Sequence, residues 1–202
     1  MNPQVMNEIE SFDFNQISQE RRNELAALID YIQTRRAEQQ LVLLNFICTH
    51  NSRRSQFAQV WAQVAADFYH IPAHSFSGGV EVTACNERTI ASLRRFGFEI
   101  NPFGQENPKY QVKWHSQQSE IVLYSKLFDD AANPDKGFAA VMTCSHADEN
   151  CPFVPGCEKR ISFPYEDPGS FDGQENESEM YDRRSKEIAT EIFYAFSKIQ
   201  QS

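Results

Sequence analysis

With 202 residues, of which 41% are hydrophobic and 23% charged, the chain is long enough for one globular domain with a sizeable core. The net charge of -9 argues against general nucleic-acid binding, because such a surface needs a basic stripe and the positive residues here are scattered. No apolar stretch approaches the roughly 18 residues of a membrane span, and the N-terminus lacks the basic start and apolar core of a secretion signal. We therefore expect a cytoplasmic protein that binds neither nucleic acid nor membrane.

The N-terminal part of the chain is expected to lie outside the main domain. Residues 1–17 are polar and are predicted to be loose, and a helix begins near Ser18. The apolar residues of this helix fall on one face: Leu25, Leu28, Ile29 and Ile32. The sequence thus predicts an N-terminal helical extension over residues 1–40 and one α/β domain over residues 41–202.

Strands and helices alternate through the rest of the chain. Four short runs have the apolar or β-rich composition of buried strands: residues 41–47, 74–80, 138–144 and 159–165. Apolar residues at helical spacing predict three further helices: residues 55–70, 86–96 and 175–199. Residues 108–126 are β-rich around a polar turn, which suggests an inserted hairpin. This order predicts a doubly wound α/β fold, with a mainly parallel sheet of about four strands, helices on both faces, and ligands bound at the carboxyl ends of the strands.

The polar loop in "CTHNSRRS" lies between the first strand and the helix that follows it. Such a loop points backbone N–H groups inward at the positive end of the helix dipole, so it binds tetrahedral oxyanions and stabilises a thiolate. Cys48 is the candidate nucleophile, Arg54 offers a planar fork for two oxygens, and Ser55 can donate its hydroxyl to the thiolate. Asn51 is expected to fold the loop through a left-handed conformation. The predicted oxyanion-binding residues are Thr49, His50, Asn51, Ser52, Arg53 and Arg54.

An alternative interpretation of this loop is an inert buried cysteine beside solvated arginines. The position of Cys48 between strand and helix, together with its spacing from Arg54, favours the chemical interpretation. Arg53 could add positive charge to the loop or face solvent, and we expect it to face solvent. The chain has five cysteines, and an odd number without a secretion signal indicates free, catalytic or metal-bound thiols.

The stretch "CTHNSRRSQ", with Cys48, Arg54 and Ser55 in place, resembles the phosphate-binding signature of the low-molecular-weight protein tyrosine phosphatases and of the thioredoxin-coupled arsenate reductases that share their fold. The resemblance runs over about residues 41–196. In that family the cysteine attacks a bound oxyanion, and an aspartate followed by proline acts as the general acid. The resemblance therefore assigns the acid to Asp167 in "EDP". On chemical grounds a leaving phenolate needs such a proton donor.

The segment "MTCSHADENCPF" holds Cys144 and Cys151 and is similar to the redox segment of the arsenate reductases. The resemblance implies that Cys48 attacks arsenate and that Cys144 then attacks Cys48 to release arsenite. Cys151 would attack Cys144 and leave a disulfide for an external thiol reductant such as thioredoxin, with no bound cofactor. Cys85 and Cys157 are expected to be passive thiols. Arsenate reduction is therefore the predicted activity.

Three other functions stay open. A phosphatase that hydrolyses phosphotyrosine through a phosphocysteine intermediate needs neither extra thiol, and Cys144 and Cys151 would then guard Cys48 against oxidation. A non-catalytic regulator would keep the oxyanion loop without turnover. A zinc-binding module could use Cys144, His146, Cys151 and Cys157, but the paired Cys-x-x-Cys turns of such sites are missing. We accordingly predict no metal site.

Overall fold

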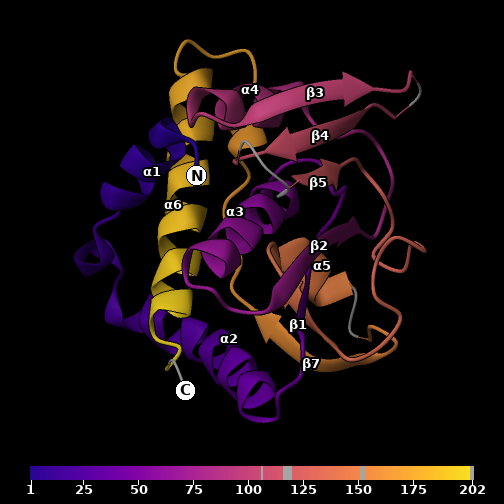
Figure 1. Cartoon of the computed structure of the whole chain (residues 1–202). Coiled ribbons are helices and arrows are strands. Elements are labelled where there is room, and N and C mark those ends of the chain that lie inside the picture. The colour runs from indigo at the N-terminus through magenta and orange to yellow at the C-terminus, as the bar shows by residue number, and fades with distance from the viewer. Residues whose placement is uncertain (106, 116–119, 151–152, 201–202) are drawn as a thin grey trace.

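A four-stranded sheet in the order β2-β1-β6-β7 forms the centre of the molecule (Figure 1). The structure is a computed structural model that describes residues 1–105, 107–115, 120–150 and 153–200. The sheet consists of β1 (Val42–Cys48), β2 (Ala73–Gly79), β6 (Phe138–Met142) and β7 (Cys157–Ser162), all parallel to their neighbours. The inner strand β1 is buried at six of its seven residues, as expected for a strand covered on both faces. The predicted parallel sheet is confirmed.

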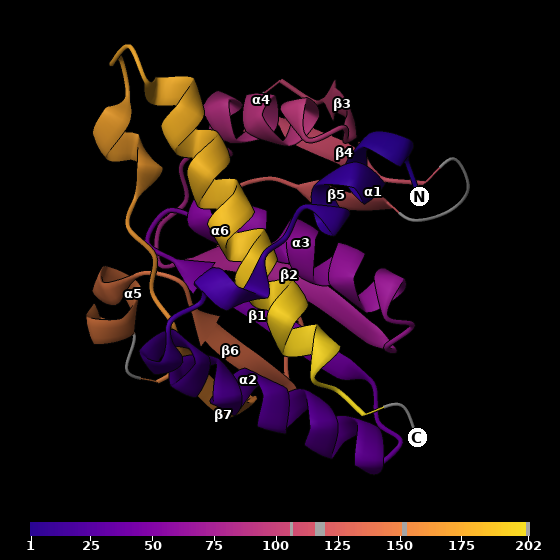
Figure 2. The ribbon, with the colours of Figure 1, turned by 90° about the vertical axis from the view of Figure 1, so that its left-hand side faces the viewer.

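Helices cover the two faces of this sheet unequally. The helices are α1 (Pro3–Glu10), α2 (Gln19–Ala37), α3 (Arg54–Phe68), α4 (Glu87–Arg95), α5 (Ser145–Asn150) and α6 (Glu177–Ser197). Leu44 and Phe46 of β1 point into the main core with residues of α2, α3 and α6, and Figure 2 shows α2 beside β7 and α6. The opposite face is covered by the short helix α5, where Ile47 packs with Met142 and Ala147. Within the described residues, none of the helices is long and apolar enough to cross a membrane.

Trp61 of α3 lies at the centre of the main core. Its side chain is fully buried, and its ring makes edge-on contacts with Phe12, Phe96, Phe98 and Phe193 at centroid distances of 5.1–6.3 Å. These contacts join α3 to α6, to the residues just after α4 and to the N-terminal segment. The aromatic residues of α3 therefore serve packing, because an edge-to-face cluster of this kind has no exposed ring face for a ligand.

The N-terminal segment is ordered, so the prediction that residues 1–17 are loose is wrong. Asn2 caps α1 by accepting a hydrogen bond from the backbone N–H of Gln4, and proline occupies the first helical position. Val5 and Ile9, four residues apart, are buried against the main core. A short 3-10 turn, η1 (Phe14–Gln16), then leads into α2. The boundary of the N-terminal extension at residue 40 stays a prediction.

The insertion between α4 and β6 forms a separate antiparallel sheet in the order β3-β4-β5. Its strands are β3 (Glu99–Phe103), β4 (Lys109–Lys113) and β5 (Glu120–Leu123). The predicted hairpin corresponds to β4 and β5, which pair from Tyr110 opposite Leu123 to Lys113 opposite Glu120. The sequence did not predict β3, because this edge strand contains a proline and four of its five residues are exposed.

Candidate functional site

The strand β1 delivers Cys48 to the carboxyl edge of the sheet, and α3 begins six residues later at Arg54. Cys48 is 3% exposed, and its Sγ lies 3.1 Å from Oγ of Ser55 in the first turn of α3. Residues 49–54 form the oxyanion loop. Within the described part of the chain, the backbone N–H groups from His50 to Arg54 donate no hydrogen bond, and no side chain caps α3. The loop therefore offers free donors at the positive end of a helix dipole, which suits a bound oxyanion.

Asn51 holds the loop in shape. Its φ of 47° is the predicted left-handed conformation, and its side chain is fully buried. The Nδ2 group donates to Oγ of Ser55 at 2.8 Å, while Oδ1 accepts the backbone N–H of Lys126 at 3.1 Å. Because Ser55 already accepts from Asn51, its own hydroxyl hydrogen is free to point at the sulfur of Cys48. A hydrogen bond from Ser55 stabilises the thiolate that a nucleophile needs.

Arg54 bridges the oxyanion loop to the acid loop, defined here as residues 165–172. Its Nη1 donates to the carbonyl of Tyr165 at 3.1 Å, and its Nη2 lies 2.6 Å from Oδ2 of Asp167. The side chain is 13% exposed, and among the described residues its buried Nε has no hydrogen-bond partner. The structure thus places the predicted acid beside the predicted anion-binding arginine. An oxyanion that reaches Arg54 would compete with Asp167 for the guanidinium.

Asp167 starts a 3-10 turn, η2 (Pro168–Phe171), and caps it through a hydrogen bond from the N–H of Gly169 to Oδ1 at 2.9 Å. The carboxyl group is 35% exposed, so a proton can reach it from solvent. The local sequence explains this turn, since aspartate before proline favours a cap followed by a fixed first helical residue.

Arg53 does not face solvent, and that prediction is wrong. The side chain is 21% exposed, and its Nε donates to Oη of Tyr181 at 2.7 Å while Nη2 lies 3.0 Å from Asp172. The Tyr181 hydroxyl donates in turn to Asp172 at 2.7 Å, and burial raises the pKa of Tyr181 above its ordinary value. These bonds fasten the acid loop to the oxyanion loop and to α6. We call Arg53, Tyr181 and Asp172 the clamp. Its one signal in the sequence was Asp172, a second carboxylate five residues after Asp167.

The remaining loop residues use their side chains for structure. Thr49 Oγ1 lies 3.2 Å from Nδ1 of His146. His50 pairs with Glu81 at 3.3 Å, and Oγ of Ser52 donates to the carbonyl of Ala84 at 2.7 Å. These side chains are therefore engaged within the protein, and the loop can offer a ligand its backbone N–H groups.

Cys144 follows β6, the strand next to β1, so it emerges at the same edge of the sheet as Cys48. It is 1% exposed, and its Sγ lies 3.5 Å from Oγ1 of Thr49. Cys48 and Cys144 belong to one small buried cluster with Ala147. The N–H of Ala147 also donates to the sulfur of Cys144 at 3.3 Å. Cys151 lies outside the described residues.

Comparison with known proteins identifies the family, although no family model matches the chain. The arsenate reductase of Staphylococcus aureus (strain Newman) is 33% identical over 124 residues, which are 61% of the chain and 76% of that protein. The low-molecular-weight phosphotyrosine phosphatase of Vibrio cholerae O395 superposes with a TM-score of 0.51 at 14% identity, covering 77% of the chain and 94% of that protein. The chain belongs to the low-molecular-weight protein tyrosine phosphatase superfamily.

The superfamily fold is shared with a second solved structure. The arsenate reductase of Archaeoglobus fulgidus DSM 4304 has a TM-score of 0.50 at 19% identity, over 77% of the chain and 99% of that protein. At this identity the likeness establishes the fold alone. Together the comparisons confirm the predicted family, whose members include both arsenate reductases and phosphatases.

Of the other described cysteines, Cys157 lies in β7, and Cys85 lies beside the oxyanion loop, since the adjoining Ala84 and Asn86 both hydrogen-bond to Ser52. Cys85 is 3% exposed, and burial raises the pKa of its thiol to about 12. Burial also raises the pKa of Cys157, in β7. Both thiols are therefore poor nucleophiles at neutral pH. Among the described residues, no three His, Cys, Asp or Glu side chains converge to hold a metal ion.

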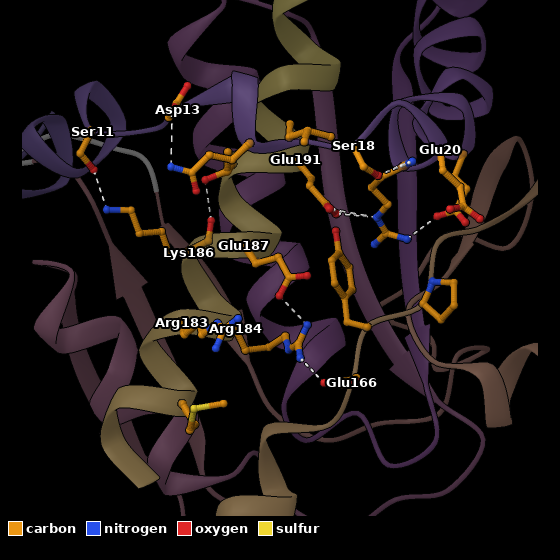
Figure 3. Close-up of a pocket in the computed structure, with 18 residues that line it drawn as sticks. Ser11, Asp13, Ser18, Glu20, Glu166, Arg183, Arg184, Lys186, Glu187 and Glu191 are labelled. Atoms are coloured by element: carbon orange, nitrogen blue, oxygen red, sulfur yellow. Dashed lines mark hydrogen bonds and ion pairs between the residues drawn. The ribbon is translucent and has the colours of Figure 1, made fainter. Parts of the chain in front are cut away.

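A hollow of about 1000 Å³ lies between the N-terminal segment, α2, α6 and residues 164–166 (Figure 3). Its charged side chains mostly bond to one another: Arg184 contacts Glu166 and Glu187, and Arg21 contacts Glu191. None of the residues that line it is a cysteine or a histidine. This hollow is the polar seam between the N-terminal segment and α6.

Proposed function

We propose that the protein reduces arsenate to arsenite through Cys48. The observation that carries this proposal is the position of Cys144. Its sulfur lies 3.5 Å from the hydroxyl of Thr49, the residue after Cys48, inside the same buried cluster. Hydrolysis of a phosphoester does not itself consume a second thiol, whereas a reductase needs one at the carboxyl end of the neighbouring strand to accept the oxidation. The 33% identity to the arsenate reductase of Staphylococcus aureus points the same way.

In the first step the Cys48 thiolate attacks the arsenic atom of bound arsenate. A sulfur–arsenic bond forms, and one arsenate oxygen leaves as water after protonation. The free N–H groups of the oxyanion loop and the guanidinium of Arg54 hold the other oxygens, and Ser55 stabilises the thiolate before attack. Asp167, 2.6 Å from Arg54, is positioned to supply the proton that the leaving oxygen needs.

In the second step the Cys144 thiolate attacks Sγ of Cys48. The sulfur–arsenic bond breaks and its electron pair stays on arsenic, so As(V) becomes As(III) and arsenite leaves. Cys48 and Cys144 are then joined by a disulfide, which accounts for the two electrons. Cys151 next attacks Cys144, which frees Cys48 and moves the disulfide to Cys144–Cys151. An external dithiol such as thioredoxin returns the pair to thiols.

Phosphoester hydrolysis is a second candidate, and the position of Asp167 favours it. A carboxyl group that is 35% exposed and touches the anion-binding arginine can protonate a leaving phenolate. The same cysteine would then form a phosphocysteine that water hydrolyses. Both reactions begin with attack by Cys48, so only the later thiols distinguish them.

The test compares matched cysteine variants in two assays. Cys48→Ser should abolish arsenate reduction with a thioredoxin system and any hydrolysis of an aryl phosphate. Cys144→Ala should abolish reduction and leave hydrolysis unchanged, while Cys157→Ala, in the outer strand β7, should leave both rates unchanged. Full arsenate reduction by Cys144→Ala would disprove the relay. If the unmodified protein hydrolyses the aryl phosphate and does not reduce arsenate, the protein is a phosphatase.

A further inference from the structure

A cavity of about 400 Å³ is lined by residues of α3, of β2, of β5 and of the segment that follows β5. This volume is in the range of small-molecule sites, roughly 300–1,000 Å³. Part of its wall is apolar, formed by Phe76, Ile121, Val122 and Ala132. The two side chains of chemical interest in the lining are Tyr124 and Lys126, from the segment that follows β5.

Lys126 is a cation without an anionic contact. It is 4% exposed, and within the described residues its ammonium group makes no hydrogen bond or ion pair. The ammonium lies 4.5 Å from the ring centroid of Tyr124, and this cation–π contact replaces little of the lost hydration. Burial lowers the pKa of Lys126 to about 8, although Asp130 favours the charged form and Lys109 opposes it. A buried charge of this kind is stabilised by any anion that reaches it.

The wall that carries Lys126 is fastened to the oxyanion loop by three consecutive residues. The carbonyl of Tyr124 accepts a hydrogen bond from Nε2 of Gln56 at 2.9 Å. Oγ of Ser125 donates to the carbonyl of His50 at 2.7 Å. These bonds mean that the segment over residues 124–126 cannot move without moving the loop.

The third bond leads directly to the nucleophile. The backbone N–H of Lys126 donates to Asn51, Asn51 donates to Ser55, and Ser55 lies 3.1 Å from the sulfur of Cys48. A shift of Lys126 toward a ligand would therefore alter the hydrogen bond that stabilises the Cys48 thiolate. The insertion thereby connects a cavity outside the oxyanion loop to the reacting sulfur.

We propose that this cavity binds a small organic carboxylate, and that its occupancy changes the reactivity of Cys48. The carboxylate pairs with Lys126, and the apolar body lies against Phe76, Ile121 and Val122. Inorganic phosphate fits less well, because the side-chain donors of Gln59, Gln63 and Ser75 in the lining already hydrogen-bond to backbone carbonyls. The proposal goes beyond the reaction at Cys48 and holds whichever oxyanion that cysteine attacks.

Binding is tested by calorimetric titration of the full chain with 4-phenylbutyrate, and with its neutral amide as the matched ligand control. The carboxylate should bind roughly tenfold more tightly than the amide, and Lys126→Met should remove this difference. Lys109→Met is the protein control, since the ammonium of Lys109 also lies 4.5 Å from the ring centroid of Tyr124 but Lys109 does not line the cavity. Ala132→Trp, at the exposed rim, should block binding without touching the core.

Four results would overturn the site. One is equal affinity for carboxylate and amide, and another is unchanged affinity in both Lys126→Met and Ala132→Trp. The third is displacement of the probe by excess inorganic phosphate, which would place it in the oxyanion loop. Absence of any binding has the same consequence.

The coupling to Cys48 is measured without turnover, so failure of the proposed reduction leaves this test intact. The rate of alkylation of Cys48 by iodoacetamide is followed by peptide mass spectrometry with and without saturating 4-phenylbutyrate. The rate should change by roughly fivefold or more in the unmodified protein and not in Ala132→Trp. An unchanged rate in the unmodified protein, with the probe bound, would refute the coupling.

Discussion

Replacing Arg53 with methionine should destabilise the protein, because Arg53 joins the oxyanion loop to the acid loop and to α6. The substitution removes a bond of 2.7 Å to the Tyr181 hydroxyl and one of 3.0 Å to the Asp172 carboxylate. Arg53 is 21% exposed and Tyr181 is fully buried, so solvent replaces these bonds poorly. Hydrogen bonds to charged groups contribute about 1.5–3 kcal/mol, and we expect a loss of that size in the free energy of unfolding.

The loss is measured by urea unfolding of Arg53→Met, with Arg183→Met, an exposed position on α6, as the control. For a chain of this length, 1 kcal/mol corresponds to roughly 2–4 °C in Tm. Tyr181→Phe removes one partner, and combining it with Arg53→Met should give a coupling of roughly 0.5 kcal/mol or more. If Arg53→Met behaves like Arg183→Met, or if the two clamp substitutions add independently, the clamp contributes nothing and this reasoning fails.

Three further substitutions test other contacts. Ser55→Ala should slow alkylation of Cys48 by iodoacetamide severalfold at neutral pH, and an unchanged rate would remove Ser55 from thiolate stabilisation. Gly169→Ala should lower stability, because the new Cβ would lie 2.7 Å from Cζ of Arg53. A Tm equal to that of the unmodified protein would show that the Arg53 side chain can move aside without loss of stability. Lys126→Met should raise the free energy of unfolding at pH 7 by up to about 3 kcal/mol, since one pKa unit is about 1.4 kcal/mol and burial lowers this pKa to about 8. Between pH 8 and 10.5 the unfolded chain binds more protons at Lys126 than the folded chain, so the unmodified protein gains stability as the pH rises. The stability difference between Lys126→Met and the unmodified protein should therefore shrink over this range. A difference in unfolding free energy that stays constant with pH would contradict the burial of a charged lysine.

The sequence predicted the parts of the site that local patterns determine. The apolar run of β1, the apolar spacing of α3 and the left-handed Asn51 each depend on a few consecutive residues. Only the family resemblance pointed to Cys144, which the structure places in one buried cluster with Cys48 because the carboxyl ends of neighbouring parallel strands meet at one edge. Family resemblance added Asp167, which the structure places beside Arg54.

The parts that were missed depend on contacts between distant segments. In the sequence, Arg53 cannot be distinguished from a solvated arginine. Its role in the clamp depends on a hydrogen bond to Tyr181, which is 128 residues away. The helix α1 was missed because two apolar residues, Val5 and Ile9, are too few for a periodic signal in a polar segment. Lys126 is an ordinary lysine in the sequence, and it becomes a buried cation only through packing of the insertion against the oxyanion loop.

The most direct test of the proposed reaction is one turnover of the fully reduced protein with arsenate, without any external reductant. The products are quenched with an alkylating reagent, arsenite is measured, and disulfides are mapped by mass spectrometry. We predict one arsenite per chain and a bridge between Cys144 and Cys151, with Cys48, Cys85 and Cys157 alkylated. Thiols that all remain reduced, or a bridge that includes Cys85 or Cys157, would contradict the relay from Cys48 through Cys144.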